Sequence, residues 1–309
     1  MTTPISTISS GSLHLDKVLG IGGFPRGCFI EVFGPETGGK TTLCQHIAAN
    51  AQKGGGICAW IDADHTLDLT YARHCSIDLE QLYLCEPYSA EQALDMLEIL
   101  AGSGSLAVIV LDSISALTPQ VELAASYGEP SLTSIDYLIS QTLSRLAGQI
   151  KRNNTLIVLS NQFHHRSGAI YHQLAANPAR LALKMHAAMR LEMRPSGLIQ
   201  GKRGFIGSQV AARVIKNNFA PCFQAVELDI MYNVGINITG EIFDLGTRLS
   251  IIEDVGSAYY FQGIRLGGGR EEVMNFMTHD KHTTDKIEEV IRQSLFFSSP
   301  MSLLFTSRL

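Results

Sequence analysis

The chain has 309 residues, of which 45% are hydrophobic and 17% are charged. This balance excludes an intrinsically disordered protein, because disordered chains combine low hydrophobicity with high charge. The net charge of −5 excludes a chain that binds nucleic acid over its whole surface, so any such contact has to be local. Six cysteines without a Cys-x-x-Cys pair, no secretory signal and no bilayer-long apolar run predict a reduced, cytoplasmic protein with no membrane partner.

Between residues 28 and 162, short apolar runs alternate with segments of helical periodicity. The apolar runs predict strands, and the periodic segments predict helices. In chain order, we expect strands at 28–35, 56–64, 82–87, 106–113 and 155–162, with helices at 40–52, 67–75, 90–102 and about 134–152. Continuous apolar strands that alternate with amphipathic helices are typical of a parallel sheet covered on both faces, so we predict an α/β fold.

The pattern changes after residue 162. Residues 163–180 show no period and mix histidine, arginine and glycine, which predicts a long functional loop. Alternating polar and apolar residues then predict antiparallel strands that extend the sheet, at 185–194, 208–217 and 224–232. From about residue 238, short strand-like and helical patterns predict a small α/β module.

A phosphate-binding motif follows the first strand. The pattern Gly-x-x-x-x-Gly-Lys-Thr requires a strand before it and a helix after it, and both are predicted here. Its residues are Gly34, Pro35, Glu36, Thr37, Gly38, Gly39, Lys40 and Thr41, with Thr42 next in the helix. Backbone N–H groups of such a loop turn toward phosphate oxygens, and the start of the helix adds positive potential. We expect Lys40, as an exposed side chain, to reach the β- and γ-phosphates and Thr41 to bind Mg²⁺; a plain glycine-rich turn is the alternative.

A phosphate loop of this kind needs a second acid to hold the magnesium shell. Asp112 follows four apolar residues in the sequence VIVLDS, where a buried strand reaches its carboxyl end. Ligands of open α/β sheets bind at that edge. We therefore predict that Asp112 binds Mg²⁺ together with Thr41; an aspartate that caps the next turn is the alternative.

Seven stretches of the sequence occur together, in the same order, in one known family. They are STISSGSLHLDKVLGIGGFPRG, EVFGPETGGKTTL, WIDADHTLDLTYAR, VIVLDSISALTP, TLIVLSNQ, VIKNNF and GEIFDLG. On these motifs, which span about residues 6–295, the chain resembles the bacterial RecA recombinases. A generic protein with a phosphate loop would share only the glycine-rich motif and the acid at a strand end.

The resemblance implies roles for residues outside the phosphate loop. Asp64 lies where the family carries the acid that positions the attacking water, and Gln162 lies where it carries a sensor of the γ-phosphate. Tyr71 would stack on adenine with Asp68 nearby. Lys216 would reach the ATP of a neighbouring subunit, as a further catalytic residue.

The resemblance also implies two DNA-facing loops, at about 124–136 and 163–180. In the second loop, Arg166 and Arg180 would meet phosphates of single-stranded DNA, and Tyr171 would stack on bases.

Three departures from the family pattern bear on activity and assembly. The water-positioning acid is Asp64 instead of glutamate, which retracts the carboxylate by on the order of an ångström, a distance that matters to rate. Asn218 replaces a second lysine, so one cross-subunit charge is lost. About five residues precede the first matching stretch, so we expect the family's N-terminal assembly segment to be absent.

These observations lead to one interpretation and one alternative. We predict a RecA-type P-loop ATPase core at 1–246, a small C-terminal α/β domain at 247–295 and a tail at 296–309. The implied function is ATP- and Mg²⁺-dependent binding of single-stranded DNA, pairing with homologous duplex DNA and strand exchange, by a homo-oligomer or filament with ATP at subunit interfaces and DNA-dependent ATPase activity. The alternative is a degenerate relative that binds ATP, hydrolyses it weakly and modulates filaments. A P-loop kinase or transporter ATPase is disfavoured because no matching substrate motif is present.

Overall fold

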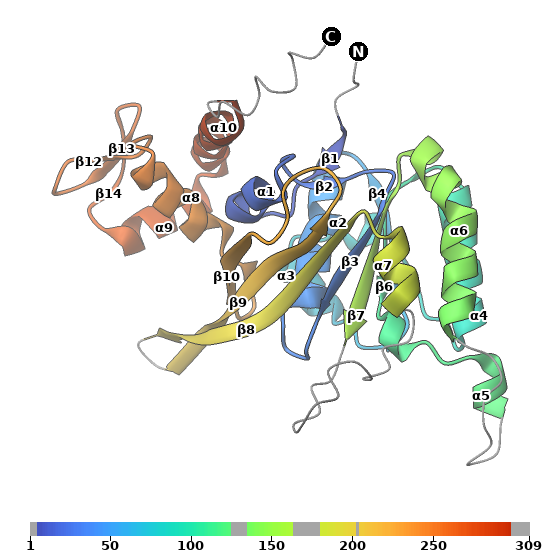
Figure 1. The fold of residues 1–309 in the computed structure, drawn as a ribbon. Helices are drawn as coiled ribbons and strands as arrows, with labels where there is room; N and C mark the ends of the chain where they lie inside the picture. Colours follow the sequence, from blue (N-terminus) through green and yellow to red (C-terminus); the bar gives the residue numbers. More distant parts are fainter. Residues whose placement is uncertain (1–4, 125–134, 163–179, 202–203, 298–309) are drawn as a thin grey trace, which may run out of the picture.

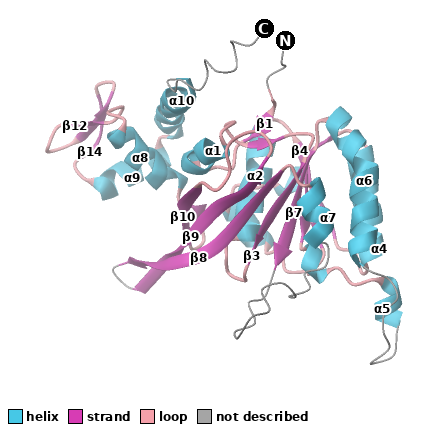
Figure 2. Cartoon of the chain, viewed as in Figure 1, coloured by secondary structure: helices cyan, strands magenta, loops and turns pink. Residues whose placement is uncertain are grey.

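The computed structural model describes residues 5–124, 135–162, 180–201 and 204–297. Within these residues, a nine-stranded mixed sheet is covered by helices on both faces (Figures 1 and 2). Its strands are β3 (Phe29–Gly34), β4 (Ile57–Asp62), β5 (Leu82–Cys85), β6 (Leu106–Asp112), β7 (Leu156–Gln162), β8 (Met189–Gly201), β9 (Gly204–Asn217), β10 (Ala225–Met231) and β11 (Gly235–Ile236). The order is β11-β10-β9-β8-β3-β7-β6-β4-β5, with β3 to β8 parallel and β9 to β11 antiparallel to their neighbours. This arrangement confirms the predicted α/β fold with its antiparallel extension.

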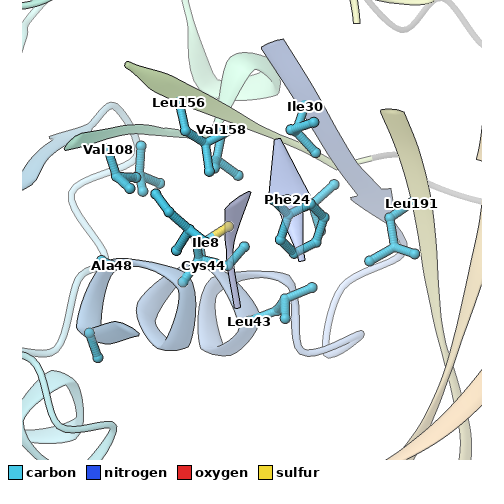
Figure 3. Packing of buried hydrophobic residues seen from close by; sticks show 14 of the residues in the cluster. Ile8, Phe24, Ile30, Leu43, Cys44, Ala48, Val108, Leu156, Val158 and Leu191 are labelled. Atoms are coloured by element: carbon cyan, nitrogen blue, oxygen red, sulfur yellow. The ribbon is translucent and has the colours of Figure 1, made fainter. Parts of the chain in front are cut away.

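Alternate residues of the central strands point into two separate hydrophobic cores. On β6, Val108 and Val110 face one core, whereas Ile109 and Leu111 face the other, as the two-residue period of a strand requires. The first core is closed by α1 (Leu13–Leu19), α2 (Lys40–Lys53) and α3 (Leu69–His74), and the second by α4 (Ala90–Gly102), α6 (Ile135–Asn153) and α7 (Arg180–His186). Figure 3 shows Leu43 and Cys44 of α2 packed beneath the sheet.

The sheet brings four strand ends, three of them polar, to one edge. The parallel strands β3, β4, β6 and β7 end at Gly34, Asp62, Asp112 and Gln162. Short helical elements lie between the strands: η1 (Leu79–Gln81) precedes β5, and η2 (Ile114–Ala116) and α5 (Gln120–Ala124) follow β6. In open α/β sheets this is the edge at which ligands bind.

The described residues after 237 form a second, smaller body, the C-terminal module (residues 238–297). It contains α8 (Ile238–Arg248), an antiparallel sheet of β12 (Glu253–Asp254), β13 (Tyr259–Phe261) and β14 (Ile264–Gly267), then α9 (Arg270–His279) and α10 (Lys281–Phe297). These elements share a hydrophobic core of their own. The sequence-predicted boundary after Gly246 falls inside α8.

The N-terminal segment of the chain connects the two bodies. Its strands β1 (Thr7–Ile8) and β2 (Phe24–Pro25), which precede and follow α1 in the sequence, pair with each other. Leu13 at the start of α1 packs in the core of the C-terminal module, whereas Leu15 and Leu19 pack in the core under the large sheet. Helix α1 therefore belongs to both cores.

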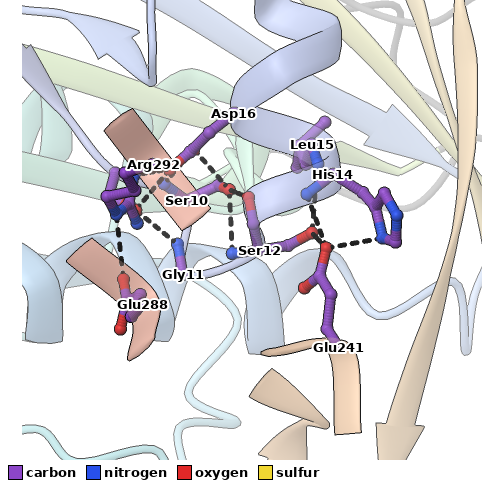
Figure 4. A network of polar contacts seen from close by, with 10 residues as sticks. Ser10, Gly11, Ser12, His14, Leu15, Asp16, Glu241, Glu288 and Arg292 are labelled. Atoms are coloured by element: carbon purple, nitrogen blue, oxygen red, sulfur yellow. Dashed lines mark hydrogen bonds and ion pairs between the residues drawn. The ribbon is translucent and has the colours of Figure 1, made fainter. Parts of the chain in front are cut away.

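Two acid–base pairs fasten the C-terminal module to this segment (Figure 4). Arg292 of α10 donates from Nη1 to Asp16 Oδ2 at 3.0 Å and from Nε to Glu288 Oε1 at 2.9 Å. The ring Nδ1 of His14 lies 2.8 Å from Glu241 Oε1 on α8. Asp16 is fully buried, and burial raises the pKa of its carboxyl although Ser9 and Arg292 act in the opposite direction.

Among the described residues, no helix is both long enough and apolar enough to cross a membrane.

Candidate nucleotide site

The phosphate loop (residues 34–41) connects the end of β3 to the start of α2. Gly39 caps α2 with a left-handed backbone, at φ 71°. A Cβ at Gly39 would lie 2.3 Å from Ile230 Cδ1, and one at Gly34 would lie 2.0 Å from the Met193 carbonyl oxygen. The loop is therefore pressed against β8 and β10: a side chain at Gly34 would overlap the backbone of β8, and the left-handed backbone at Gly39 favours glycine.

Lys40, the first residue of α2, is buried instead of exposed as the sequence suggested. Its side chain folds back across the loop, and Nζ donates to the Pro35 carbonyl at 2.7 Å. Burial lowers the pKa of the ammonium, while the nearby carboxylates of Asp112, Glu36 and Asp64 act in the opposite direction. The ammonium thus lies within the curve of the loop, where phosphate oxygens bind in such motifs.

Thr41 and Asp112 meet as the sequence predicts, and they fit a magnesium site. The Thr41 hydroxyl donates to Asp112 Oδ2 at 2.7 Å. Burial raises the pKa of Asp112, and the hydrogen bond from Thr41 opposes that shift. A hydroxyl and a carboxylate oxygen at the end of a strand are ligands that Mg²⁺ takes beside nucleotide phosphates.

Asp64 lies two residues beyond the end of β4, in a turn that Asp62 organises. The Asp62 carboxylate accepts from the backbone N–H groups of Thr66, at 3.3 Å, and Leu67, at 3.0 Å. The Thr66 hydroxyl donates to Asp64 Oδ1 at 2.8 Å. Burial, with contributions from Asp112 and Asp62, raises the pKa of Asp64 to about 6. Ser113, the residue after Asp112, has its hydroxyl oxygen 3.5 Å from Asp64 Oδ2, so Asp64 faces the end of β6.

Gln162, the last residue of β7, contacts two parts of the same edge. Its side-chain Nε2 donates to Glu36 Oε1 of the phosphate loop at 2.8 Å, and its backbone N–H donates to Ser115 Oγ at 3.2 Å. Ser115 and its neighbour Ser113 were not among the residues that the sequence suggested. Their only signal is that DSIS continues directly from the strand end at Asp112.

Tyr71 and Asp68 are positioned by helix α3. The Tyr71 hydroxyl lies 3.2 Å from Thr42 Oγ1 on α2. Asp68 caps α3, because its Oδ1 accepts from the backbone N–H groups of Thr70, at 2.7 Å, and Tyr71, at 3.2 Å. This cap fixes the start of the helix that carries Tyr71 beside the phosphate-loop helix.

Lys216 stands on β9, two strands from β3 in the sheet order. Its Nζ donates to the carbonyl oxygens of Lys184, at 3.1 Å, and Met185, at 3.4 Å, near the end of α7. Burial, followed by the charge of Arg190, lowers the pKa of Lys216.

The predicted DNA-contacting residues fall mostly outside the described residues. Arg166 and Tyr171 lie in the range 163–179, which the structure does not describe, and so does most of the predicted loop at 124–136. Arg180 is the first residue of α7, but its side chain is outside the described part.

Family models cover nearly the whole chain. The RecA N-terminal domain matches residues 1–237, and the RecA C-terminal domain matches residues 240–296. The chain belongs to the RecA family. It is 41% identical over 302 residues to Protein RecA of Ehrlichia canis (strain Jake), covering 98% of this chain and 85% of that protein. It is 42% identical over 290 residues to Protein RecA of Chelativorans sp. (strain BNC1), covering 94% of this chain and 81% of that protein.

A solved structure supports the fold independently. The crystal structure of the RadB recombinase aligns with a TM-score of 0.56 at 20% identity, over 74% of this chain and 98% of the other. The RecA family comprises P-loop ATPases that bind ATP with magnesium, and its function lies in DNA recombination and repair. Family membership confirms the predicted resemblance and gives this chain that recombinase function.

Proposed function

We propose that this chain is a DNA-dependent ATPase that binds single-stranded DNA, pairs it with homologous duplex DNA and exchanges strands. The observation that carries the proposal is the gathering of Lys40, Thr41, Asp112, Asp64 and Gln162 at one edge of the sheet. Phosphoryl transfer is catalysed almost entirely by positioning and by stabilising charge. At this edge the phosphate loop, the Thr41–Asp112 pair that would hold Mg²⁺ and the acid Asp64 would supply both the positioning and the charge stabilisation.

The roles of the loop residues follow from their contacts. Backbone N–H groups of residues 34–41 and the Lys40 ammonium would hold the β- and γ-phosphates, while Thr41 and Asp112 would hold Mg²⁺, which neutralises developing charge. Tyr71, on its capped helix, would stack on adenine, with Asp68 nearby. Lys40 and Thr41 stand on α2, Asp112 on β6 and Tyr71 on α3, so the core itself sets the spacing of these side chains.

Asp64 would align the attacking water, and Gln162 would report the γ-phosphate. With a pKa of about 6, Asp64 is ionised at neutral pH and can accept a hydrogen bond from water. Gln162 already contacts the phosphate loop through Glu36 and precedes the loop at 163–180 directly, so a change at the phosphates reaches that loop through one residue.

DNA and a neighbouring subunit would complete the site. Arg166, Tyr171 and Arg180 would contact single-stranded DNA in the manner of basic and aromatic residues in other single-strand grooves. Lys216 would reach ATP bound by the next protomer, so that nucleotide lies at subunit interfaces of an oligomer or filament.

One observation favours the second candidate, a modulator that binds ATP and hydrolyses it weakly. The shorter Asp64 carboxylate accepts the Thr66 hydroxyl two residues along its own turn, which keeps it close to the main chain. A short acid held back in this way aligns water poorly.

The two candidates differ in turnover, so the test is the ATPase rate with and without single-stranded DNA. We expect DNA to stimulate hydrolysis of Mg²⁺–ATP, and ATP to tighten binding of a labelled oligonucleotide. Lys40→Ala should abolish both effects while its circular dichroism spectrum stays that of the parent. ATP binding without DNA-stimulated turnover would replace the first candidate by the second, and a chain that binds neither ligand would refute both.

A further inference from the structure

A line of hydrogen bonds joins Asp64 to Gln162 through two serines. The Ser113 hydroxyl donates to Asp64 Oδ2 at 3.5 Å, and the Ser113 and Ser115 hydroxyl oxygens are 2.9 Å apart. Ser115 Oγ in turn accepts from the backbone N–H of Gln162 at 3.2 Å. The line crosses from β4 over β6 to β7, which are adjacent in the sheet.

Each serine hydroxyl in this line has one proton to donate. With the Ser113 proton directed to Asp64, the bond between the two serines is donated by Ser115, whose oxygen accepts the Gln162 N–H. In that arrangement all three donors point toward Asp64, and each bond polarises the next.

The weakest link lies at the acid. The 3.5 Å between Ser113 and Asp64 is at the limit of a hydrogen bond, and the interaction strengthens steeply as the atoms approach. A shift of a few tenths of an ångström at Asp64 therefore makes or breaks this link. The two links through Ser115 are shorter, and Ser113 itself is buried.

Ser115 is the residue through which the two ends of the line are joined, because its hydroxyl contacts both Ser113 and the Gln162 backbone. It lies in η2, just after the strand end at Asp112, and its hydroxyl oxygen accepts the Gln162 N–H. Gln162 has its side chain committed to Glu36 of the phosphate loop. The main chain of Gln162 thus contacts the line that leads to Asp64, while its side chain contacts the phosphate loop.

We propose that Ser115 is a positioning residue that couples the position of Asp64 to the main chain of Gln162. The proposal rests on the proposed function, in which Asp64 aligns water and Gln162 precedes a DNA-facing loop. Through Ser115, the water-aligning acid and the loop respond to each other inside one protomer. This path is separate from the contact of Gln162 with the phosphate loop.

The coupling itself is tested without activity, by NMR of the Gln162 backbone amide in the full chain. Asp64→Asn should shift this resonance in the parent, and Ser115→Ala should remove that response. Thr118→Ala is the matched control, because within the described part of the chain its hydroxyl donates to the nearby Ala116 carbonyl, at 3.5 Å, and to no member of the line, so it should leave the response intact. An equal response with and without the Ser115 hydroxyl, or no response in the parent, would overturn the coupling.

The consequence for catalysis is tested by steady-state kinetics. Ser115→Ala should lower kcat for DNA-stimulated ATP hydrolysis threefold to tenfold and leave KM for ATP within twofold, and Ser115→Thr, which keeps the hydroxyl, should restore at least half of the rate. An unchanged kcat, or a loss that threonine does not restore, would refute the positioning role. If DNA fails to stimulate the parent, the proposed function falls, and the NMR experiment still decides whether the coupling exists.

Discussion

Removing Arg292 should loosen the C-terminal module from the rest of the chain, at a cost that the structure allows one to work out. Asp16, its partner, is fully buried and accepts from Ser9 Oγ at 2.5 Å, from Ser10 N at 2.8 Å and from Arg292 Nη1 at 3.0 Å. Arg292→Ala removes the only positive charge that contacts this carboxylate among the described residues. The variant must then bury an unpaired charge or take up a proton.

Breaking a buried pair by removing one partner costs about 3–5 kcal/mol. We expect the lower end, about 3 kcal/mol, because the serine donors around Asp16 remain and the Arg292 side chain is 28% exposed. With a denaturant slope of about 3 kcal/mol per molar urea, this corresponds to a midpoint lower by about 1 M. Burial already raises the pKa of Asp16, and the loss of Arg292 raises it further.

The matched control is Arg270→Ala in the same module. Arg270 pairs with Asp244, but both side chains are about half exposed, at 54% and 45%, and exposed pairs contribute about 1 kcal/mol or less. Its midpoint should fall by about 0.3 M urea. Equal and small shifts for the two variants, followed by circular dichroism, would refute the argument that burial of Asp16 sets the cost.

Three further predictions concern acid stability, DNA binding and turnover. His46 is buried and accepts the Ile236 N–H at 2.9 Å, and burial lowers its pKa to about 4. The unfolded chain therefore binds a proton below pH 6.5 that the folded chain refuses, so the contribution of His46 to stability should fall by about 2 kcal/mol between pH 7 and pH 5, against the opposite contribution of Asp64, whose pKa is raised. Urea unfolding at both pH values should show a smaller loss for His46→Gln. Tyr171→Ala should weaken single-stranded DNA binding about tenfold by fluorescence anisotropy with ATP affinity unchanged, and equal DNA affinities would exclude the second loop as the DNA site. Asp64→Glu should raise kcat at saturating ATP and DNA, because the longer side chain reaches past Thr66; an unchanged or lower kcat would count against the short-acid argument.

The fold was predictable where local pattern decides it. The run LAVIVLD is apolar on both faces and becomes β6, whose residues divide between two cores. The fastening of the C-terminal module was not predictable in the same way. Asp16 and Arg292 are 276 residues apart, and nothing in the local sequence of either residue indicates its partner.

The site residues that could be predicted are those that lie in one contiguous motif or at the end of a predicted strand. The phosphate loop and Asp112 are of this kind, and Thr41 and Asp112 do meet. The burial of Lys40 was not predicted, because the motif indicates only that the side chain binds phosphate. In the structure the Pro35 carbonyl of the same loop accepts from Lys40 Nζ and holds the side chain inward. Ser115 was missed because a lone serine after a strand carries no pattern, and its partners become visible only when β6 and β7 are placed side by side.

Both the Asp16–Arg292 pair and the candidate site contain a buried charge. They differ in how much of the hydrogen-bonding capacity of that charge is used within the chain. Asp16 is surrounded by donors from Ser9, Ser10 and Arg292, so it needs nothing more and its burial serves the fold. Lys40 is also buried, yet its ammonium has three protons and the described contacts give it one hydrogen-bond acceptor, the Pro35 carbonyl. A buried charge with unused hydrogen-bonding capacity is costly, and phosphate oxygens would supply the missing acceptors. The phosphate loop is therefore built around a ligand, whereas the pair at Asp16 is complete within the chain.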